Sequence, residues 1–185
     1  MHSILPHTDN PTLKQIAQDI RVSDIQSSRI QTLIADMKAL LAKEEYGVAL
    51  AAPQVGKSVR LFIVSGTAAE KRAHANKTRK TDDAVMARDS LPARDEVYIN
   101  PELIKMSRGR KDKHEGCLSV RGKWGMVPRA EKATVRAYDE HGVQFTRGAS
   151  GLLAQIFQHE LDHLNGILYL DKAREIFEEL SDTVL

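Results

Sequence analysis

The nine residues QHELDHLNG (158–166) decide which fold this sequence can adopt, because they contain the metal-binding pattern HExxH. His159 and His163 stand four positions apart, so on a helix both imidazoles share one face and can bind one ion. Glu160 follows the first histidine, and in metal-dependent hydrolases of this pattern its carboxylate takes the proton from metal-bound water. A divalent ion lowers the pKa of such a water from about 15.7 to roughly 7. The pattern supplies two ligands, so a third must come from elsewhere.

The residues around this pattern predict a buried helix. Ser150 can open the helix, which runs to about Leu164, and Gly166 stands just past its end. Burying polar and charged side chains is costly unless they bind a partner. A bound metal therefore explains this segment better than a merely hydrogen-bonded pair of histidines. The apolar residues that flank the pattern are Leu152, Leu153, Ile156, Phe157 and Leu164.

Two sources of a third ligand lie downstream. The metzincin pattern HExxHxxGxxH would place a histidine at position 169, but this residue is Tyr169, so that pattern fails. A thermolysin-type acidic ligand stays open, although its candidates fall on a segment that we expect to be a charged, solvated helix face. These candidates are Glu175, Glu178 and Glu179.

A third source is upstream. Cys117 follows Gly116 at what the sequence predicts to be a strand edge, where backbone can approach a ligand closely. A lone cysteine is usually a small buried hydrophobe. One cysteine and two histidines would nevertheless leave a tetrahedral ion one position for water, which is typical of a catalytic site.

Length and composition limit the class of protein. A chain of 185 residues suits one domain, 1–185, that can bury a core without disulfides. A net charge of +2 argues against nucleic acid as a specific partner. One cysteine excludes an internal disulfide and favours a reducing compartment. The sequence shows neither a secretory h-region nor an apolar run of roughly 18 residues, so we expect a cytoplasmic protein with no membrane contact.

The other elements follow from hydrophobic periodicity. Residues 24–45 predict a helix capped by Asp24 and ended by Gly47, with its apolar stripe facing the core. Residues 59–64 and 97–100 predict strands, and the latter leads into a basic, glycine-containing connection. Residues 133–139 and 143–146 predict a hairpin with its turn near Gly142. The stripe comprises Ile30, Leu33, Ile34, Met37, Leu40 and Leu41.

Two further segments complete the prediction of the fold. Residues 66–95 show no sustained period and predict a long surface loop inserted in the domain. The sequence DKAREIFEELSD (171–182) predicts a short amphipathic helix. The fold class is therefore α+β, with antiparallel or mixed sheets packed around a central metal-binding helix and helices near both termini.

Three segments in this order resemble the peptide deformylase family. EGCLS (115–119) and QHELDH (158–163) match two of its signatures residue for residue. GVALAAPQVG (47–56) matches the first signature, G-x-G-x-A-A-x-Q, with Ala49 in place of its second glycine. The resemblance covers most of the chain from about residue 28 to residue 172.

The resemblance implies a role for each matching residue. Cys117, His159 and His163 would hold the metal, which is ferrous iron in the cell and can be zinc, nickel or cobalt in a purified sample. Glu160 would be the general base and then the proton donor to the leaving amine. The remaining implied roles are oxyanion stabilisation by Gln54 and the backbone N–H of Leu118, and main-chain contacts to the peptide by Gly47, Val48, Ala49 and Gly116.

The resemblance also implies the reaction. Water bound to the metal would attack the formyl carbon of an N-formyl-methionyl nascent peptide and release formate. A transient contact with the ribosome is an open expectation, because the C-terminal segment is short and acidic, unlike the basic tail of some relatives. Arg129 and Asp162 would form a pair beneath the metal helix, with a surface pair as the open alternative.

Departures from the family pattern motivate a second hypothesis, and a third stands beside it. Ala49 adds a Cβ where the family has none, and Arg121 replaces a common proline, with Trp124 just beyond. Arg121 and Trp124 are expected at the rim of the cleft. These changes motivate a metal-binding protein without deformylase activity as the second hypothesis. The third is a zincin-type endopeptidase, which would not need Cys117.

Overall fold

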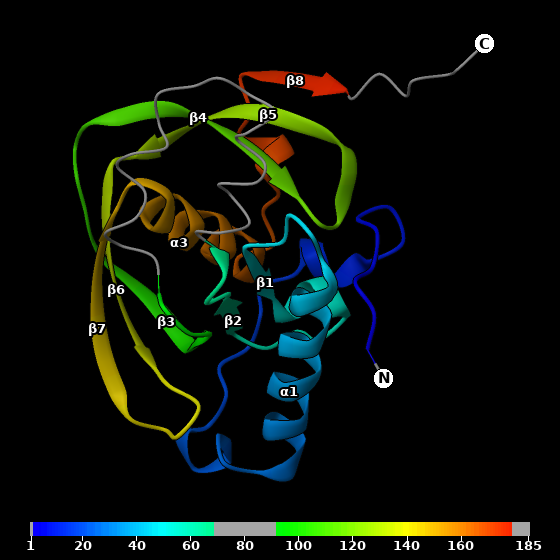
Figure 1. Cartoon of the computed structure of the whole chain (residues 1–185), viewed down its shortest axis with the longest axis vertical. Helices are drawn as coiled ribbons and strands as arrows, with labels where there is room; N and C mark the ends of the chain where they lie inside the picture. Colours follow the sequence, from blue (N-terminus) through cyan, green and yellow to red (C-terminus); the bar gives the residue numbers. More distant parts are fainter. Residues whose placement is uncertain (1, 69–91, 179–185) are drawn as a thin grey trace.

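The computed structural model describes residues 2–68 and 92–178 and contains two antiparallel sheets around one buried helix (Figure 1). The first sheet has the strand order β1-β2-β3-β6-β7, and the second has the order β4-β5-β8. This arrangement confirms the α+β class and the central helix. In chain order the elements are η1 (Pro11–Lys14), η2 (Val22–Asp24), α1 (Ser28–Lys43), β1 (Ala49–Ala51), η3 (Ala52–Val55), β2 (Leu61–Val64), β3 (Glu96–Met106), β4 (Arg110–Cys117), β5 (Val120–Ala130), β6 (Lys132–Tyr138), β7 (Gln144–Ser150), α3 (Gly151–Leu164), η5 (Tyr169–Asp171) and β8 (Glu175–Glu178), where η marks a short 3₁₀ turn.

The central helix α3 has the predicted bounds. Ser150 is its N-cap in extended conformation, and Gly166 follows its end at φ +73°, which favours glycine. Every residue from Leu152 to Leu164 is buried. Phe157 packs among the rings of Phe62 and Tyr98, with centroids 6.3 and 5.2 Å away. The apolar side of α3 therefore anchors the helix on the five-stranded sheet, so its polar residues lie on a rigid element.

Helix α1 covers the other side of the same sheet. Its predicted apolar stripe is buried against Leu61 and Ile63 of β2, apart from Leu40, which is half-buried. The predicted N-cap is wrong. The helix begins after Ser27, whose hydroxyl accepts from the N–H of Ile30, whereas Asp24 belongs to η2. Asp24 instead uses its backbone carbonyl to hold Ser27, which places the serine at the cap.

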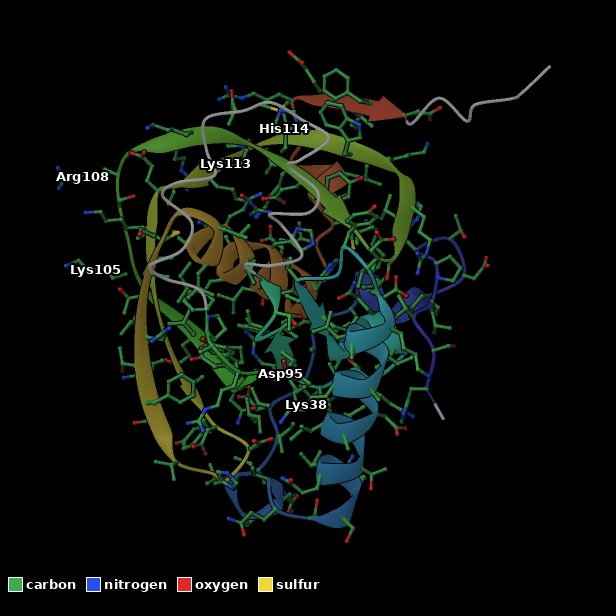
Figure 2. All side chains as sticks on the ribbon, viewed as in Figure 1. Lys38, Asp95, Lys105, Arg108, Lys113 and His114 are labelled. Atoms are coloured by element: carbon green, nitrogen blue, oxygen red, sulfur yellow. The ribbon has the colours of Figure 1, made fainter. Side chains whose placement is uncertain are left out.

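The hairpin of β4 and β5 is a correction to the sequence analysis, which predicted a connection after residue 100 and a strand edge only at Gly116 and Cys117. Its eight-residue register runs from Arg110 opposite Ala130 to Cys117 opposite Val120. Much of β4 is polar because its outer side faces solvent, as Lys113 and His114 show at the rim of the molecule (Figure 2). A run of β-branched and aromatic residues, the signal that predicted the strands at 59–64 and 97–100, is therefore missing in β4. The hairpin of β6 and β7 is confirmed, with Gly142 at φ +80° in its turn.

The segment DKAREIFEELSD is the second correction. Its described part contains strand β8, which pairs antiparallel with β5, instead of the predicted helix. Phe177 stacks on Trp124 with centroids 4.1 Å apart, so the strand gains an aromatic contact that a helix at this edge would not provide. Tertiary contact thus overrides the helical pattern.

Two further expectations concern the surface loop 66–95 and membrane-spanning helices. Of the predicted surface loop 66–95, residues 69–91 lie outside the described residues. Among the described helices, none is long and apolar enough to cross a membrane.

Candidate metal centre and active site

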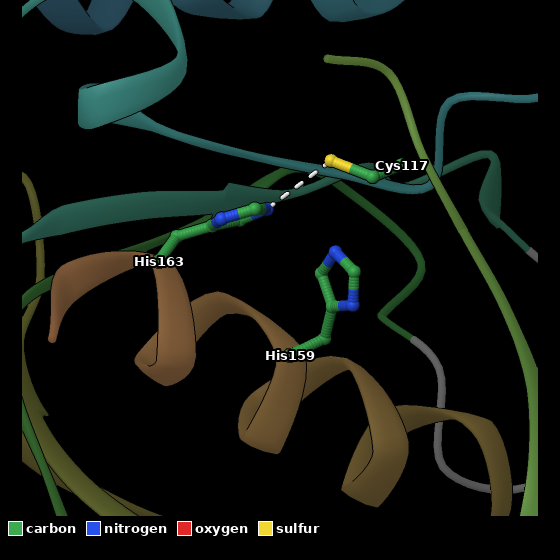
Figure 3. Close-up of side chains that lie close together, drawn as sticks. All are labelled: Cys117, His159 and His163. Carbon is green, nitrogen blue, oxygen red and sulfur yellow. Dashed lines mark hydrogen bonds between the residues drawn. The ribbon is translucent and has the colours of Figure 1, made fainter. Parts of the chain in front are cut away.

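Three predicted ligands meet in one cluster. Cys117 ends β4, and His159 and His163 project from the same face of α3 towards it (Figure 3). Their ligand atoms all lie within 4.8 Å of one another, and Sγ of Cys117 is 3.3 Å from Nε2 of His163. The two imidazole planes are nearly perpendicular, at 89°. The structure therefore brings the upstream cysteine to the HExxH helix.

This donor set fits a single metal ion. A thiolate at about 2.3 Å and an imidazole nitrogen at about 2.0 Å from a tetrahedral ion lie roughly 3.5 Å apart, close to the observed spacing of Cys117 and His163. Burial, followed by the charge of His159, holds the pKa of His163 well below its usual range, which favours the neutral ligand form. Burial opposes the charged form of His159 as well, but hydrogen bonds with Cys117 and Glu115 raise its pKa well above its usual value. The cluster therefore keeps His163 neutral, whereas Cys117 and Glu115 attract positive charge to His159 alone.

Glu115 orients the first histidine, a role that the sequence analysis missed. His159 Nδ1 donates to Glu115 Oε2 at 2.9 Å, which leaves Nε2 for a metal. Burial alone would raise the pKa of Glu115, but hydrogen bonds from Arg129 and His159 outweigh it and lower this pKa to about 2. The available signal was its position two residues before Cys117, which places both side chains on one face of a strand.

A buried chain of ion pairs continues from Glu115. Arg129 donates to both oxygens of Glu115, at 2.7 and 2.8 Å, and to Asp162 at 2.7 Å. Asp162 also accepts from Lys172 at 2.5 Å. The predicted contact between Arg129 and Asp162 is thus buried beneath α3, and the surface alternative is wrong. These ion pairs connect α3 to both strands of the β4–β5 hairpin.

Glu160 lies beside the cluster with an unusual electrostatic environment. It is 4% exposed, and its Oε2 has no hydrogen-bond partner among the described residues. Burial raises the pKa of Glu160 to about 7, against the opposing effect of His159. A carboxyl group with a pKa near neutrality can both accept and return a proton at the working pH.

Gln54, in η3, contacts the cluster through Cys117. Its Nε2 donates to Cys117 Sγ at 3.4 Å, and its Oε1 accepts from the N–H of Ala51 at 2.7 Å. The second contact fixes which end of the amide faces the sulfur. Leu118 follows Cys117 in the β4–β5 turn and lies against Gly47, where an added Cβ would be 3.2 Å from Leu118 Cδ1. Both expected oxyanion donors therefore come from segments that flank the metal ligands.

The carboxylate alternatives for the third ligand are not supported by the described residues. The cluster there contains only Cys117, His159 and His163. Glu178, on β8, instead forms an ion pair of 2.8 Å with Lys123 on β5. Glu175 also lies on this exposed strand, and Glu179 lies outside the described residues.

Comparison with known proteins decides the family. The sequence profile of polypeptide deformylases matches residues 1–178. The chain belongs to the polypeptide deformylase family. Peptide deformylase 2 of a Nostoc species is 35% identical over 173 residues, covering 94% of this chain and 87% of that protein. Deformylases remove the N-formyl group from nascent peptides and depend on a metal, so the hydrolase function inferred from the sequence is confirmed.

Solved deformylase structures share this fold. A peptide deformylase from Legionella pneumophila has a TM-score of 0.72 and 35% identity, with 93% of this chain and 85% of that chain covered. An actinonin-bound class I type b enzyme from Acinetobacter baumannii has a TM-score of 0.72 and 29% identity, covering 94% and 98%. The described sheets and central helix are thus those of a deformylase.

Residues 47–56, the first segment that matches the family, contain β1, which lies at an edge of the five-stranded sheet. Gly47 and Val48 lead into β1, which pairs on one side with β2 and begins at Ala49 opposite Val64. Ala49 is buried and has a negative φ, so the alanine fits without backbone strain. Gly116 lies in β4, exposed, directly before Cys117.

The other two positions, Arg121 and Trp124, lie on β5, and Trp124 is the cross-strand partner of Gly116. Arg121 is exposed and pairs with Glu44 at 2.9 Å, which links the β4–β5 turn to the end of α1. Trp124 stacks between His114 and Phe177 on the three-stranded sheet. Their expected place at the cleft rim stays a prediction.

Proposed function

We propose that Cys117, His159 and His163 hold one divalent ion at which this deformylase hydrolyses N-formyl-methionyl nascent peptides. One observation carries the proposal: the three ligand atoms converge within 4.8 Å beside a buried carboxyl group. A bound divalent ion supplies hydroxide at neutral pH, because it lowers the pKa of a coordinated water from about 15.7 to roughly 7.

Glu160 moves the proton in this proposal. Its carboxylate takes the proton from the attacking water and then gives it to the nitrogen of the leaving amine. Its pKa of about 7 suits both steps, because the group can be found in either protonation state near neutral pH. Its position on α3, next to His159, keeps the carboxyl group beside the reacting water.

Gln54 and Leu118 stabilise the negative charge that develops on the formyl oxygen. The Nε2 of Gln54 and the backbone N–H of Leu118 are fixed donors in a largely buried site, where hydrogen bonds to a developing charge are most effective. Removing one such donor typically lowers the rate by roughly 100- to 1,000-fold. The fixed orientation of the Gln54 amide, set by Ala51, supports this assignment.

The peptide binds as an added strand. Main-chain groups of Gly47 and Val48 before β1, of Ala49 in β1 and of Gly116 on β4 would pair with the substrate backbone. Backbone pairing does not depend on side-chain identity, so it suits an enzyme that must accept many different nascent chains.

The remaining proposals concern the cellular setting. The ion is Fe²⁺ in the cell, with Zn²⁺, Ni²⁺ or Co²⁺ able to replace it. A thiolate ligand is open to oxidation, so a reducing cytoplasm fits this chemistry. A transient contact with the ribosome fits the substrate, because formylated chains emerge there. The chain 1–185 would act as one catalytic domain, with 66–95 as a surface insertion.

A formate-release assay tests the proposal. The substrate is a formyl-methionyl dipeptide, and the protein is prepared anaerobically and loaded with iron. We expect turnover that actinonin inhibits, and a fall of roughly 100- to 10,000-fold in kcat for Glu160→Gln with one equivalent of metal retained. Full activity in a metal-loaded Glu160→Gln sample would overturn the assigned role.

A further inference from the structure

The segment Leu5–Ala17, here called the N-terminal strap, contacts all three chain segments that build the site. These are η3 with Gln54, the β4–β5 turn with Leu118, and the end of α3 with His163. Figure 1 shows this segment, in blue, beside the elements that surround α3. The deformylase chemistry proposed above assigns the strap no role.

The strap holds η3 through two hydrogen bonds. The N–H of Leu5 donates to the carbonyl of Gln54 at 2.9 Å, and Asn10 Nδ2 donates to the carbonyl of Pro53 at 2.8 Å. Asn10 is 2% exposed, and its Oδ1 accepts from the N–H of Thr12 at 3.2 Å. Both ends of the Asn10 amide are therefore engaged, which fixes the side chain in one orientation.

The strap holds the β4–β5 turn through His7. Its N–H donates to the carbonyl of Ser119 at 2.8 Å, and its Nδ1 lies 3.2 Å from the same oxygen. Ser119 is buried, and its hydroxyl accepts from Gln54 Nε2 at 3.5 Å. The strap, Gln54 and Ser119 therefore form a closed ring of contacts.

A third contact reaches the metal-binding helix. The N–H of Ala17 donates to the carbonyl of Leu164, the residue after His163, at 2.9 Å. Gly166 leaves room for this approach, because a Cβ there would lie 2.9 Å from the carbonyl carbon of Lys14.

The strap adds backbone contacts between two oxyanion donors that come from different parts of the fold. In the part of the chain that the structure describes, these donors are otherwise joined only by the side-chain hydrogen bonds of Gln54 to Cys117 and Ser119. Gln54 follows β1 of the five-stranded sheet, whereas Leu118 connects two strands of the three-stranded sheet. Within residues 2–68 and 92–178, no backbone hydrogen bond joins η3 directly to the β4–β5 turn. A displacement of about 1 Å can lower a catalytic rate by roughly 100-fold.

We propose that His7 and Asn10 are positioning residues that set the distance between the Gln54 amide and the Leu118 N–H. This inference rests on the proposed function, since it assumes that these two groups stabilise the oxyanion. His7 acts through the Ser119 carbonyl and Asn10 through the Pro53 carbonyl, and neither residue touches the substrate. Loss of either contact should slow the chemical step and leave peptide binding and metal binding intact.

Two isosteric substitutions at adjacent positions test the proposal. Asn10→Asp keeps the acceptor for Thr12 but turns a carboxylate oxygen towards the Pro53 carbonyl. The matched control is Asp9→Asn, at an exposed neighbour. We expect Asn10→Asp to lower kcat by about 10- to 100-fold, with KM and the metal dissociation constant changed less than twofold, and Asp9→Asn to leave all three values unchanged.

A second variant and a second readout guard against simple misfolding. His7→Ala keeps the backbone bond to Ser119 and should lower kcat several-fold. In both variants we expect faster amide hydrogen exchange at Leu5 and at residue 7, whose N–H groups donate to Gln54 and Ser119, and unchanged exchange within α3. A kcat within twofold of the parent in His7→Ala and in folded Asn10→Asp overturns the proposal, as does unchanged exchange at these two amides. A parent protein without deformylase activity would refute the proposed function instead, while the exchange measurement would still report on the strap.

Discussion

Glu115 connects the proposed metal ligand His159 to the buried ion pairs of the site. It accepts from His159 and pairs with Arg129 through both oxygens. Such partners of metal ligands fix the orientation of the ring and raise the basicity of the coordinating nitrogen. The carboxylate therefore should contribute to metal affinity without touching the ion.

Substitution of Glu115 by glutamine tests this role. Glu115→Gln keeps an acceptor for His159 but removes the negative charge, so we expect metal affinity to fall by roughly 10- to 100-fold. Competition with a coloured chelator measures the dissociation constant. Glu131→Gln, which breaks only the surface pair with Lys111, is the control and should bind metal as tightly as the parent. Equal affinities in the two variants would contradict the assignment.

Individual residue types were predictable where chemistry restricts them. The sequence predicted that Cys117, His159 and His163 would meet, because few residue types bind metal, and the structure brings them together. The contact of Arg129 with Asp162 was implied by the resemblance to the family, and the structure shows it as a buried pair. The positions of His7 and Asn10 could not be predicted. Their hydrogen bonds go to backbone carbonyls, and a carbonyl leaves no signature in the sequence of the segment that supplies it.

At the scale of elements, β8 shows how contacts between distant segments override local pattern. Residues 171–182 favour an amphipathic helix, yet Phe177 stacks on Trp124 and the described part pairs with β5. The β4–β5 hairpin escaped prediction for a related reason, since its outward positions are polar and its inward positions carry Glu115 and Arg129. Apolar periodicity detects strands whose buried positions are all apolar, whereas the buried positions of this hairpin mix the charged Glu115 and Arg129 with the cluster around Val127.

The aromatic contact between β8 and β5 gives a prediction about stability. Phe177→Ala should lower the free energy of unfolding by about 1–2 kcal/mol, since the ring is half-buried and stacked. Because Trp124 is the only tryptophan, its fluorescence should shift to the red in this variant. Ile176→Ala, at a neighbouring position that is 50% exposed, should leave both quantities nearly unchanged. A kcat that falls more than twofold in Phe177→Ala would show that β8 also shapes the site.

At the scale of the whole molecule, the metal centre lies where the two sheets meet the central helix. Cys117 comes from the three-stranded sheet, the histidines from α3, and Gln54 from beside the five-stranded sheet. A bound ion would therefore cross-link separate parts of the fold. The sequence predicted the α+β class and the central helix. It did not predict that β4 pairs with β5 or that this hairpin contacts α3, because both depend on contacts between distant segments.

Metal removal tests the cross-link. A ligand at 100 times its dissociation constant stabilises a protein by about 2.7 kcal/mol, and each kcal/mol shifts the Tm of a domain of this size by roughly 2–4 °C. We expect a chelator to lower the Tm of the parent by about 5–10 °C. Cys117→Ala should melt at the same temperature with and without the chelator. A parent Tm that does not respond to the chelator would argue against a structural contribution of the ion.

The coordination of the ion itself tests the central claim most directly. X-ray absorption spectroscopy of the iron- or zinc-loaded protein should show one sulfur at about 2.3 Å and two imidazole nitrogens at about 2.0–2.1 Å. Cys117→Ala should lose the sulfur and keep the nitrogens. A parent spectrum with no sulfur among the ligands would contradict the account, because the ion would then not join Cys117 to the HExxH helix.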